Sequence, residues 1–208
     1  MIEIMFEKTT PLSPFTIENL SKSIQNGHLL PTELTEFCLG RIKKFNHKLN
    51  SFITVLDDEK IFEFAEQCDR QVKQNSFLDP LLGIPYSIKD TIHVKDIGFT
   101  GGSKYYANSI SNSTASIVKI LNKKGAILMD KNNLNEFASG ITGKNSIFGD
   151  SKNPWDLSRI SGGSSGGSAI AVATDGCIFF RDGYRWFCKS SSIPLWCGRY
   201  EALLWRSK

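Results

Sequence analysis

The sequence has little of what defines several common classes of protein. Only three of its 208 residues are histidine, and its five cysteines form no Cys-x-x-Cys pair. Neither a metal site nor a disulfide framework is therefore indicated. No apolar run approaches the roughly 18 residues that a membrane helix requires. We expect no bound metal and no membrane partner.

The start of the chain also lacks the pattern of a secretion signal. Residues 1–4 read Met-Ile-Glu-Ile, which puts an acid where a signal peptide carries basic residues. The composition, with 40% hydrophobic and 22% charged residues, is that of a globular protein with an apolar core. We expect a cytoplasmic protein.

The small net charge of +4 comes entirely from the end of the chain. Residues 177–208 hold six basic and two acidic side chains, with three of the four tryptophans and three of the five cysteines. Residues 1–176 are balanced in charge, so we expect no direct binding of nucleic acid. The abrupt change in composition divides the chain into part of a single domain, residues 1–176, and an aberrant tail, residues 177–208.

Apolar spacing predicts two amphipathic helices in the first third of the chain. The first stripe follows Pro31 and comprises Leu34, Phe37, Cys38, Ile42 and Phe45; the second follows Asp58 and comprises Ile61, Phe64, Ala65, Cys68 and Val72. We interpret both stripes as faces that pack on the core. A helix at residues 16–25 and a short strand at residues 52–56 complete a largely helical N-terminal region.

From Leu81 onward the pattern changes to strand, helix, strand. An apolar run at residues 82–88 precedes a capped helix at residues 113–125, and a second apolar run follows at residues 126–129. Alternation of this kind is typical of α/β proteins with a buried, largely parallel sheet.

A glycine-rich loop at residues 162–168 leads into the small apolar residues 169–173. Backbone amides at such a helix start can bind an anion or a developing oxyanion. A phosphate-binding P-loop would close with Gly-Lys-Ser/Thr, and no lysine is present here. A flexible linker would lie between polar segments, which also does not fit.

Two serine motifs are weaker alternatives. Ser165 matches the G-x-S-x-G pattern of α/β-hydrolases, in which the histidine follows the serine. All three histidines precede it: they are His28, His47 and His93. Ser116 and Lys119 form an S-x-x-K match, but both lie on the periodic helix and we interpret them as surface residues. A serine without histidine can instead be activated by a buried, neutral lysine, and Lys89 is the candidate.

Three segments together resemble the amidase signature family: residues 83–90 (Gly-Ile-Pro-Tyr-Ser-Ile-Lys-Asp), residues 145–155 and residues 162–168. The resemblance covers roughly residues 82–176 and implies a mixed sheet covered by helices on both faces, incomplete in this chain. It also implies an amide C–N bond hydrolase with a catalytic lysine, a serine in a cis peptide and a second, nucleophilic serine. The lysine corresponds to Lys89 and the cis serine to Ser164. This chemistry acts on a small-molecule amide and needs no cofactor.

The nucleophilic serine of the family is missing. It should close a G-T/S-D-T-G-G-S segment about two dozen residues after Ser164, near Cys188, where residues 181–188 read Arg-Asp-Gly-Tyr-Arg-Trp-Phe-Cys. Reading suitable codons one base later restores a family-like segment. Its two glycines at Trp186 and Trp196 follow from the single codon of tryptophan. We hypothesise a frameshift near residues 179–181, which leaves this chain inactive.

The resemblance leaves the role of the family member open. A free-standing amidase hydrolyses small carboxamides, whereas the A subunit of glutamyl-tRNA amidotransferase releases ammonia from glutamine for its partner subunits. Residues 135–142, Asn-Glu-Phe-Ala-Ser-Gly-Ile-Thr, look more like the free-standing enzymes. A non-enzymatic fragment of a pseudogene is a further alternative.

Overall fold

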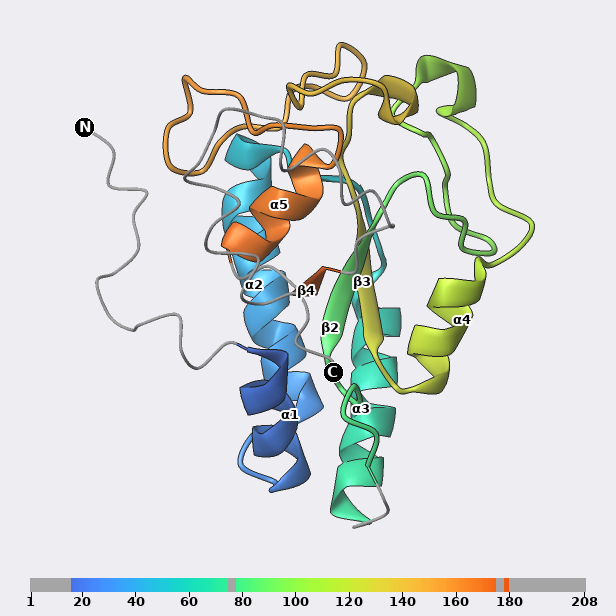
Figure 1. Ribbon diagram of the computed structural model, residues 1–208. Coiled ribbons are helices and arrows are strands. Elements are labelled where there is room, and N and C mark those ends of the chain that lie inside the picture. The colour runs from blue at the N-terminus through green and yellow to red at the C-terminus, as the bar shows by residue number, and fades with distance from the viewer. Residues whose placement is uncertain (1–15, 75–77, 175–177, 180–208) are drawn as a thin grey trace, which may run out of the picture.

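The computed structural model describes residues 16–74, 78–174 and 178–179 (Figure 1). The elements in chain order are α1 (Ile17–Gln25), α2 (Pro31–Leu49), β1 (Phe52–Val55), α3 (Asp58–Lys73), β2 (Pro85–Lys89), η1 (Lys104–Tyr106), α4 (Ser116–Lys123), β3 (Ile127–Asn132), η2 (Glu136–Ala138), α5 (Gly166–Ala173) and β4 (Ile178–Phe179). No helix in these ranges is long and apolar enough to cross a membrane.

The described strands form one four-stranded sheet in the order β1-β3-β2-β4. β2 is parallel to both β3 and β4, while β1 is antiparallel to β3. The predicted α/β class is thus confirmed, with a mixed sheet. Because β2 and β3 are parallel, their carboxyl ends lie at the same edge, where the long loops gather at the top of Figure 1.

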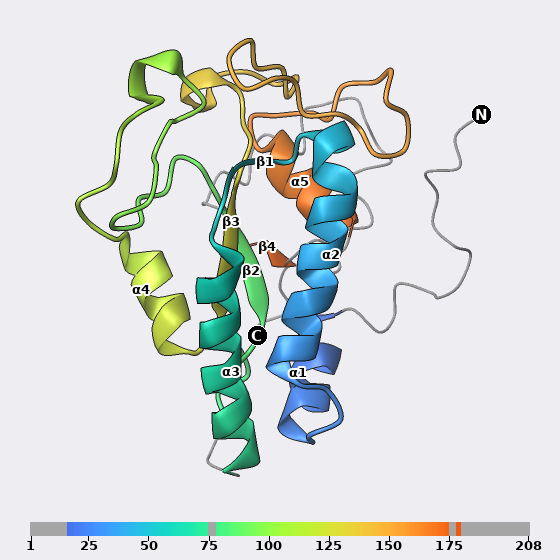
Figure 2. The same ribbon diagram turned by 180° about the vertical axis from the view of Figure 1, so that it is seen from behind.

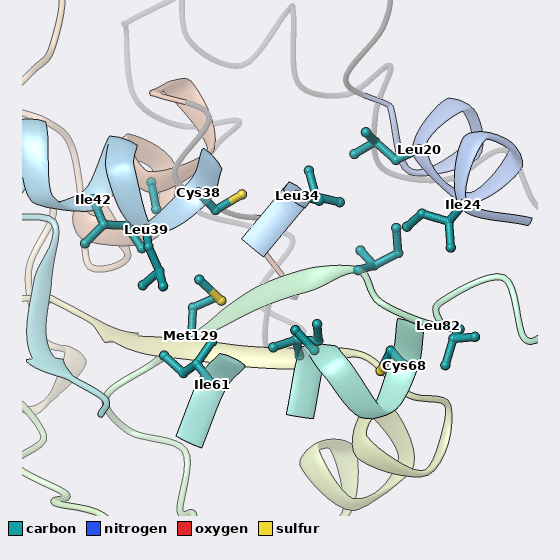
Figure 3. Packing of buried hydrophobic residues seen from close by; sticks show 14 of the residues in the cluster. Leu20, Ile24, Leu34, Cys38, Leu39, Ile42, Ile61, Cys68, Leu82 and Met129 are labelled. Atoms are coloured by element: carbon teal, nitrogen blue, oxygen red, sulfur yellow. The ribbon is translucent and has the colours of Figure 1, made fainter. Parts of the chain in front are cut away.

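Helices cover both faces of this sheet (Figures 1 and 2). On one face, apolar residues of α1, α2, α3 and α5 pack against those of β3, including Met129, which is fully buried. Figure 3 shows this packing, with Leu34 and Ile42 of α2 and Ile61 of α3 in the same layer. On the other face, α4 packs against Tyr86 and other residues of β2. The layers are those that the sequence resemblance implies.

Helix boundaries follow local sequence signals with one exception. Thr16 caps α1, because its hydroxyl accepts a hydrogen bond from the Asn19 amide at 3.1 Å. α2 begins at Pro31, as predicted, since proline suits the first turn of a helix. α4 begins only at Ser116 and has no side-chain cap, so the predicted capped start at residue 113 is wrong.

Some residues of the predicted apolar stripes lie on the surface. Phe37 is 42% exposed, although its stripe neighbours Leu34 and Cys38 are buried. On α4, Val118 and Leu121 face the sheet, while the other apolar residues are turned outward. A helix with adjacent apolar residues fits two overlapping stripes, and only packing decides which one is buried.

Candidate active site

Two residues 75 positions apart in the chain meet at the carboxyl edge of the sheet. Lys89 ends β2, and Ser164 lies in the loop that enters α5. The Lys89 Nζ donates a hydrogen bond to the Ser164 Oγ at 2.8 Å. Lys89 is only 4% exposed, and the Gly163–Ser164 peptide bond is cis. The structure therefore brings together the two residues that the sequence analysis singled out.

Close backbone packing requires glycine on both sides of Ser164. A Cβ atom at Gly163 would lie 2.1 Å from the Asn135 Oδ1, and one at Gly167 would lie 2.3 Å from the Ser51 carbonyl oxygen. Both distances are far below van der Waals contact. The backbone of Ser164 is held in place as well, because the backbone N–H of Asn135 donates a hydrogen bond to the Ser164 carbonyl oxygen at 3.3 Å.

A buried polar cluster lies on the same face of the sheet as Lys89. The Asn132 Oδ1 accepts hydrogen bonds from the Ser87 Oγ at 3.0 Å and from the Ser168 Oγ at 3.2 Å. Asn132 is also the register partner of Lys89 across the β2–β3 ladder. Its Nδ2 has no hydrogen-bond partner within the described part of the chain. The sequence analysis missed this cluster, although the alternation of Ser87 and Lys89 along a strand would have indicated a shared polar face.

A second polar group lies on the opposite side of β2. Asp90 and Lys131 are fully buried, and the Lys131 Nζ lies 2.6 Å from the Asp90 Oδ1. Burial lowers the pKa of the Lys131 ammonium below its ordinary value, and the neighbouring Asp90 carboxylate opposes only part of this shift. The sequence analysis missed Lys131 as well, since a lysine at the end of an apolar strand is commonly a surface residue.

The alternative serine sites receive no support from the geometry. His28, His47 and His93 are all exposed, and the His93 Nδ1 is hydrogen-bonded to the Ser111 Oγ at 3.0 Å. Ser116 and Lys119 both lie on the exposed side of α4, as the sequence predicted. Within residues 16–74, 78–174 and 178–179, no group of three histidine, cysteine or acidic side chains could hold a metal ion.

The predicted nucleophile position near Cys188 lies outside the described residues, as does most of the tail from residue 177. Ile178 and Phe179 are described and form β4, in register with Tyr86 and Ser87 of β2. The hypothesised frameshift near residues 179–181 would thus follow directly after a strand of this sheet.

A family model described as Amidase matches residues 33–179. Among curated relatives, the A subunit of glutamyl-tRNA(Gln) amidotransferase from Coxiella burnetii (strain RSA 493 / Nine Mile phase I) is 44% identical over 158 residues, 76% of this chain and 32% of the relative. The protein of the same name from Legionella pneumophila (strain Paris) is 42% identical, again over 76% of this chain and 32% of the relative. The chain therefore spans about a third of the length of these relatives.

Solved structures agree in fold. The peptide amidase from Stenotrophomonas maltophilia superposes with a TM-score of 0.73 at 29% identity, covering 80% of this chain and 35% of that one. A structure described as an amidase gives a TM-score of 0.72 at 32% identity, covering 79% and 37%.

Proposed function

The chain belongs to the amidase signature family, and from this premise we propose that it is the N-terminal part of an enzyme that hydrolyses an amide C–N bond. The observation that carries the proposal is the 2.8 Å hydrogen bond between the Lys89 Nζ and the Ser164 Oγ. Lys89 is only 4% exposed, so it does not serve as a charged surface residue, and its contact with a serine hydroxyl suits it to proton transfer.

In the proposed mechanism, Lys89 acts as the base in its neutral form. It takes the proton of the Ser164 hydroxyl, which in turn takes a proton from the nucleophilic serine. The nucleophile then attacks the amide carbonyl, and the leaving amine takes the proton back from Lys89 through Ser164. Water then loses a proton to the same relay, hydrolyses the acyl-enzyme and restores the nucleophilic serine. The Asn135 amide supports the relay because it fixes the backbone of Ser164.

The nucleophile would come from the segment after β4. This strand runs parallel to β2, so its carboxyl end points to the same edge of the sheet as Lys89. We propose that the intact gene continues there with the Gly-Gly-Ser segment of the family and that a frameshift near residues 179–181 replaces it. The chain as written then has a base and a relay without a nucleophile, and it is inactive.

For the substrate, we propose glutamine, with ammonia passed on to partner subunits. The support is the name and the 44% identity of the related amidotransferase protein, against 29% for the peptide amidase. A free-standing amidase is the second candidate, because residues 135–142 resemble such enzymes.

The test begins with the DNA and messenger RNA across codons 174–208 and downstream. An open second frame that encodes the Gly-Gly-Ser segment would allow the full-length enzyme to be expressed, alone and with partner subunits encoded in the same genome. We expect ammonia release from glutamine that is lost in Lys89→Ala and in Ser164→Ala and is retained in Lys119→Ala, which changes an exposed lysine of α4. Hydrolysis of small carboxamides without glutaminase activity would favour the free-standing amidase. Full activity of Lys89→Ala would refute the mechanism.

A further inference from the structure

The ion pair between Asp90 and Lys131 is fully buried and has further hydrogen-bond partners. The Lys131 Nζ lies 2.6 Å from the Asp90 Oδ1 and donates to the Gly98 carbonyl at 2.6 Å. The other oxygen of Asp90, Oδ2, accepts a hydrogen bond from the Thr100 amide at 3.0 Å and another from the Thr100 hydroxyl. The Lys131 Nζ also lies 5.6 Å from the centre of the Phe99 ring. Both side chains are fully buried.

A buried ion pair of this kind contributes little to the net stability of a fold. Removing two charges from water costs several kcal/mol per ion, and a buried pair often does no better than apolar residues of the same volume. We therefore expect Asp90 and Lys131 to have a function other than stabilising the fold.

The pair lies one residue along the chain from the proposed base, on the opposite side of the sheet. Asp90 follows Lys89 just after the end of β2, and the contacts of the two side chains place them on opposite sides of the sheet. Lys89 faces Ser164, while Asp90 faces Thr100. The backbone of Asp90 is fixed on both sides, because its amide donates to the Asn132 carbonyl at 3.2 Å and its carbonyl accepts from the Gly101 amide at 3.1 Å. The backbone position of Asp90 relative to Lys89 is therefore fixed.

Few other charges surround this region of the described structure. α5, β4 and residues 98–102 carry no ionisable side chain. β3 contributes Asp130 besides Lys131; burial raises the pKa of the Asp130 carboxyl to about 8, so it is largely neutral at pH 7. Glu136 of η2 accepts a hydrogen bond from the Ser103 hydroxyl at 2.7 Å. In the loop that leads to Ser164, Arg159 pairs with Asp156 and Lys152 pairs with Asp150. Among these described groups, Asp90 is the acidic residue adjacent to Lys89 in the chain, and its charge is balanced by Lys131.

We propose that Lys131 is a positioning residue for Lys89: it neutralises the Asp90 carboxylate, so that this carboxylate does not hold the adjacent base in its charged form. The inference rests on the proposed function, because it takes Lys89 as the base. It assigns Lys131 a role in the proton affinity of a group on the other side of the strand.

The test uses the full chain labelled with ¹³C at lysine Cε, whose chemical shift follows the charge of each amine during a pH titration. Lys89→Met identifies the Lys89 signal. In Lys131→Met, the unpaired carboxylate should raise the Lys89 pKa by about one unit or more. In the double variant Asp90→Asn/Lys131→Met, the value should return to within about 0.3 units of the parent. Lys124→Met is the control, because it removes a partly exposed pair with Asp79 and should leave Lys89 unchanged.

Asp90→Asn alone separates this effect from a loosened site. Loosening would admit water to Lys89 and raise its pKa in every variant, whereas the inference predicts no rise in Asp90→Asn. A rise in Asp90→Asn, or no rise in Lys131→Met, would overturn it. If Lys131→Met does not fold, Lys131→Gln keeps a donor for Gly98 and Asp90 and is judged by the same criterion. The titration does not depend on turnover. The proposed function can therefore fail in the hydrolysis assays while this inference stands, and this inference can fail in the titration while the proposed function stands.

Discussion

Replacing Asp130 by asparagine should change how the stability of the protein depends on pH. Asp130 is fully buried on β3, and its Oδ1 accepts a hydrogen bond from the Leu56 amide at 3.0 Å. Its Oδ2 has no partner among the described residues. Burial raises the pKa of the carboxyl to about 8, with the Leu56 amide opposing the rise and the Asp58 charge adding to it.

The sign of the effect follows from the two proton affinities. In the unfolded chain the carboxyl titrates at about pH 4, whereas in the folded protein it keeps its proton to about pH 8. Between these values the folded state binds one proton more, so the free energy of unfolding falls as pH rises, by about 1.4 kcal/mol per unit. Over the whole interval the loss is about 5 kcal/mol. It is absent below pH 4 and complete above pH 8.

Asp130→Asn keeps the size of the side chain and removes the titration. Urea unfolding followed by circular dichroism from pH 5 to pH 8 should show the variant gaining on the parent by about 1.4 kcal/mol per pH unit. Glu63→Gln, on the exposed side of α3, is the control and should give a constant difference. A constant difference for Asp130→Asn as well would refute the reasoning.

Two further substitutions test the packing of the site and of the core by thermal or urea unfolding. Gly163→Ala should destabilise the protein and disturb the Lys89–Ser164 contact, because the new Cβ would lie 2.1 Å from the Asn135 Oδ1; Gly40→Ala, in a helix with open space around it, should instead stabilise by about 0.5–1 kcal/mol. Met129→Ala should cost about 2–5 kcal/mol because the side chain is fully buried. A cost for Met129→Ala below about 0.5 kcal/mol, or a stabilising Gly163→Ala, would contradict the packing described.

The sequence predicted the parts of this structure that depend on local pattern. The helices of the N-terminal region and the strands on either side of α4 follow from periodicity, and α1 begins and ends where its capping residues indicate. The start of α4 and the exposure of Phe37 could not be read from pattern alone, since both depend on which face packs against the sheet.

The residues of the candidate site also fall into two groups: those that the sequence indicated and those that it did not. Lys89 and Ser164 were found through family resemblance, because no periodicity predicts a 2.8 Å contact between residues so far apart in the chain. Asn132 and Lys131 were missed because the sequence of β3 does not itself show that its last two polar residues are buried. Their roles depend on β2 and β3 being adjacent and parallel.

The adjacency of β2 and β3 also explains why the contact between Lys89 and Ser164 can form without the proposed nucleophile. Lys89 lies on β2, its register partner Asn132 lies on β3, and Ser164 is held by Asn135, just after β3. All of these residues precede the position of the hypothesised frameshift. On the proposed function, loss of the downstream segment would therefore remove turnover without removing the Lys89–Ser164 contact, and the Lys89 titration in the present chain would report on the proposed base.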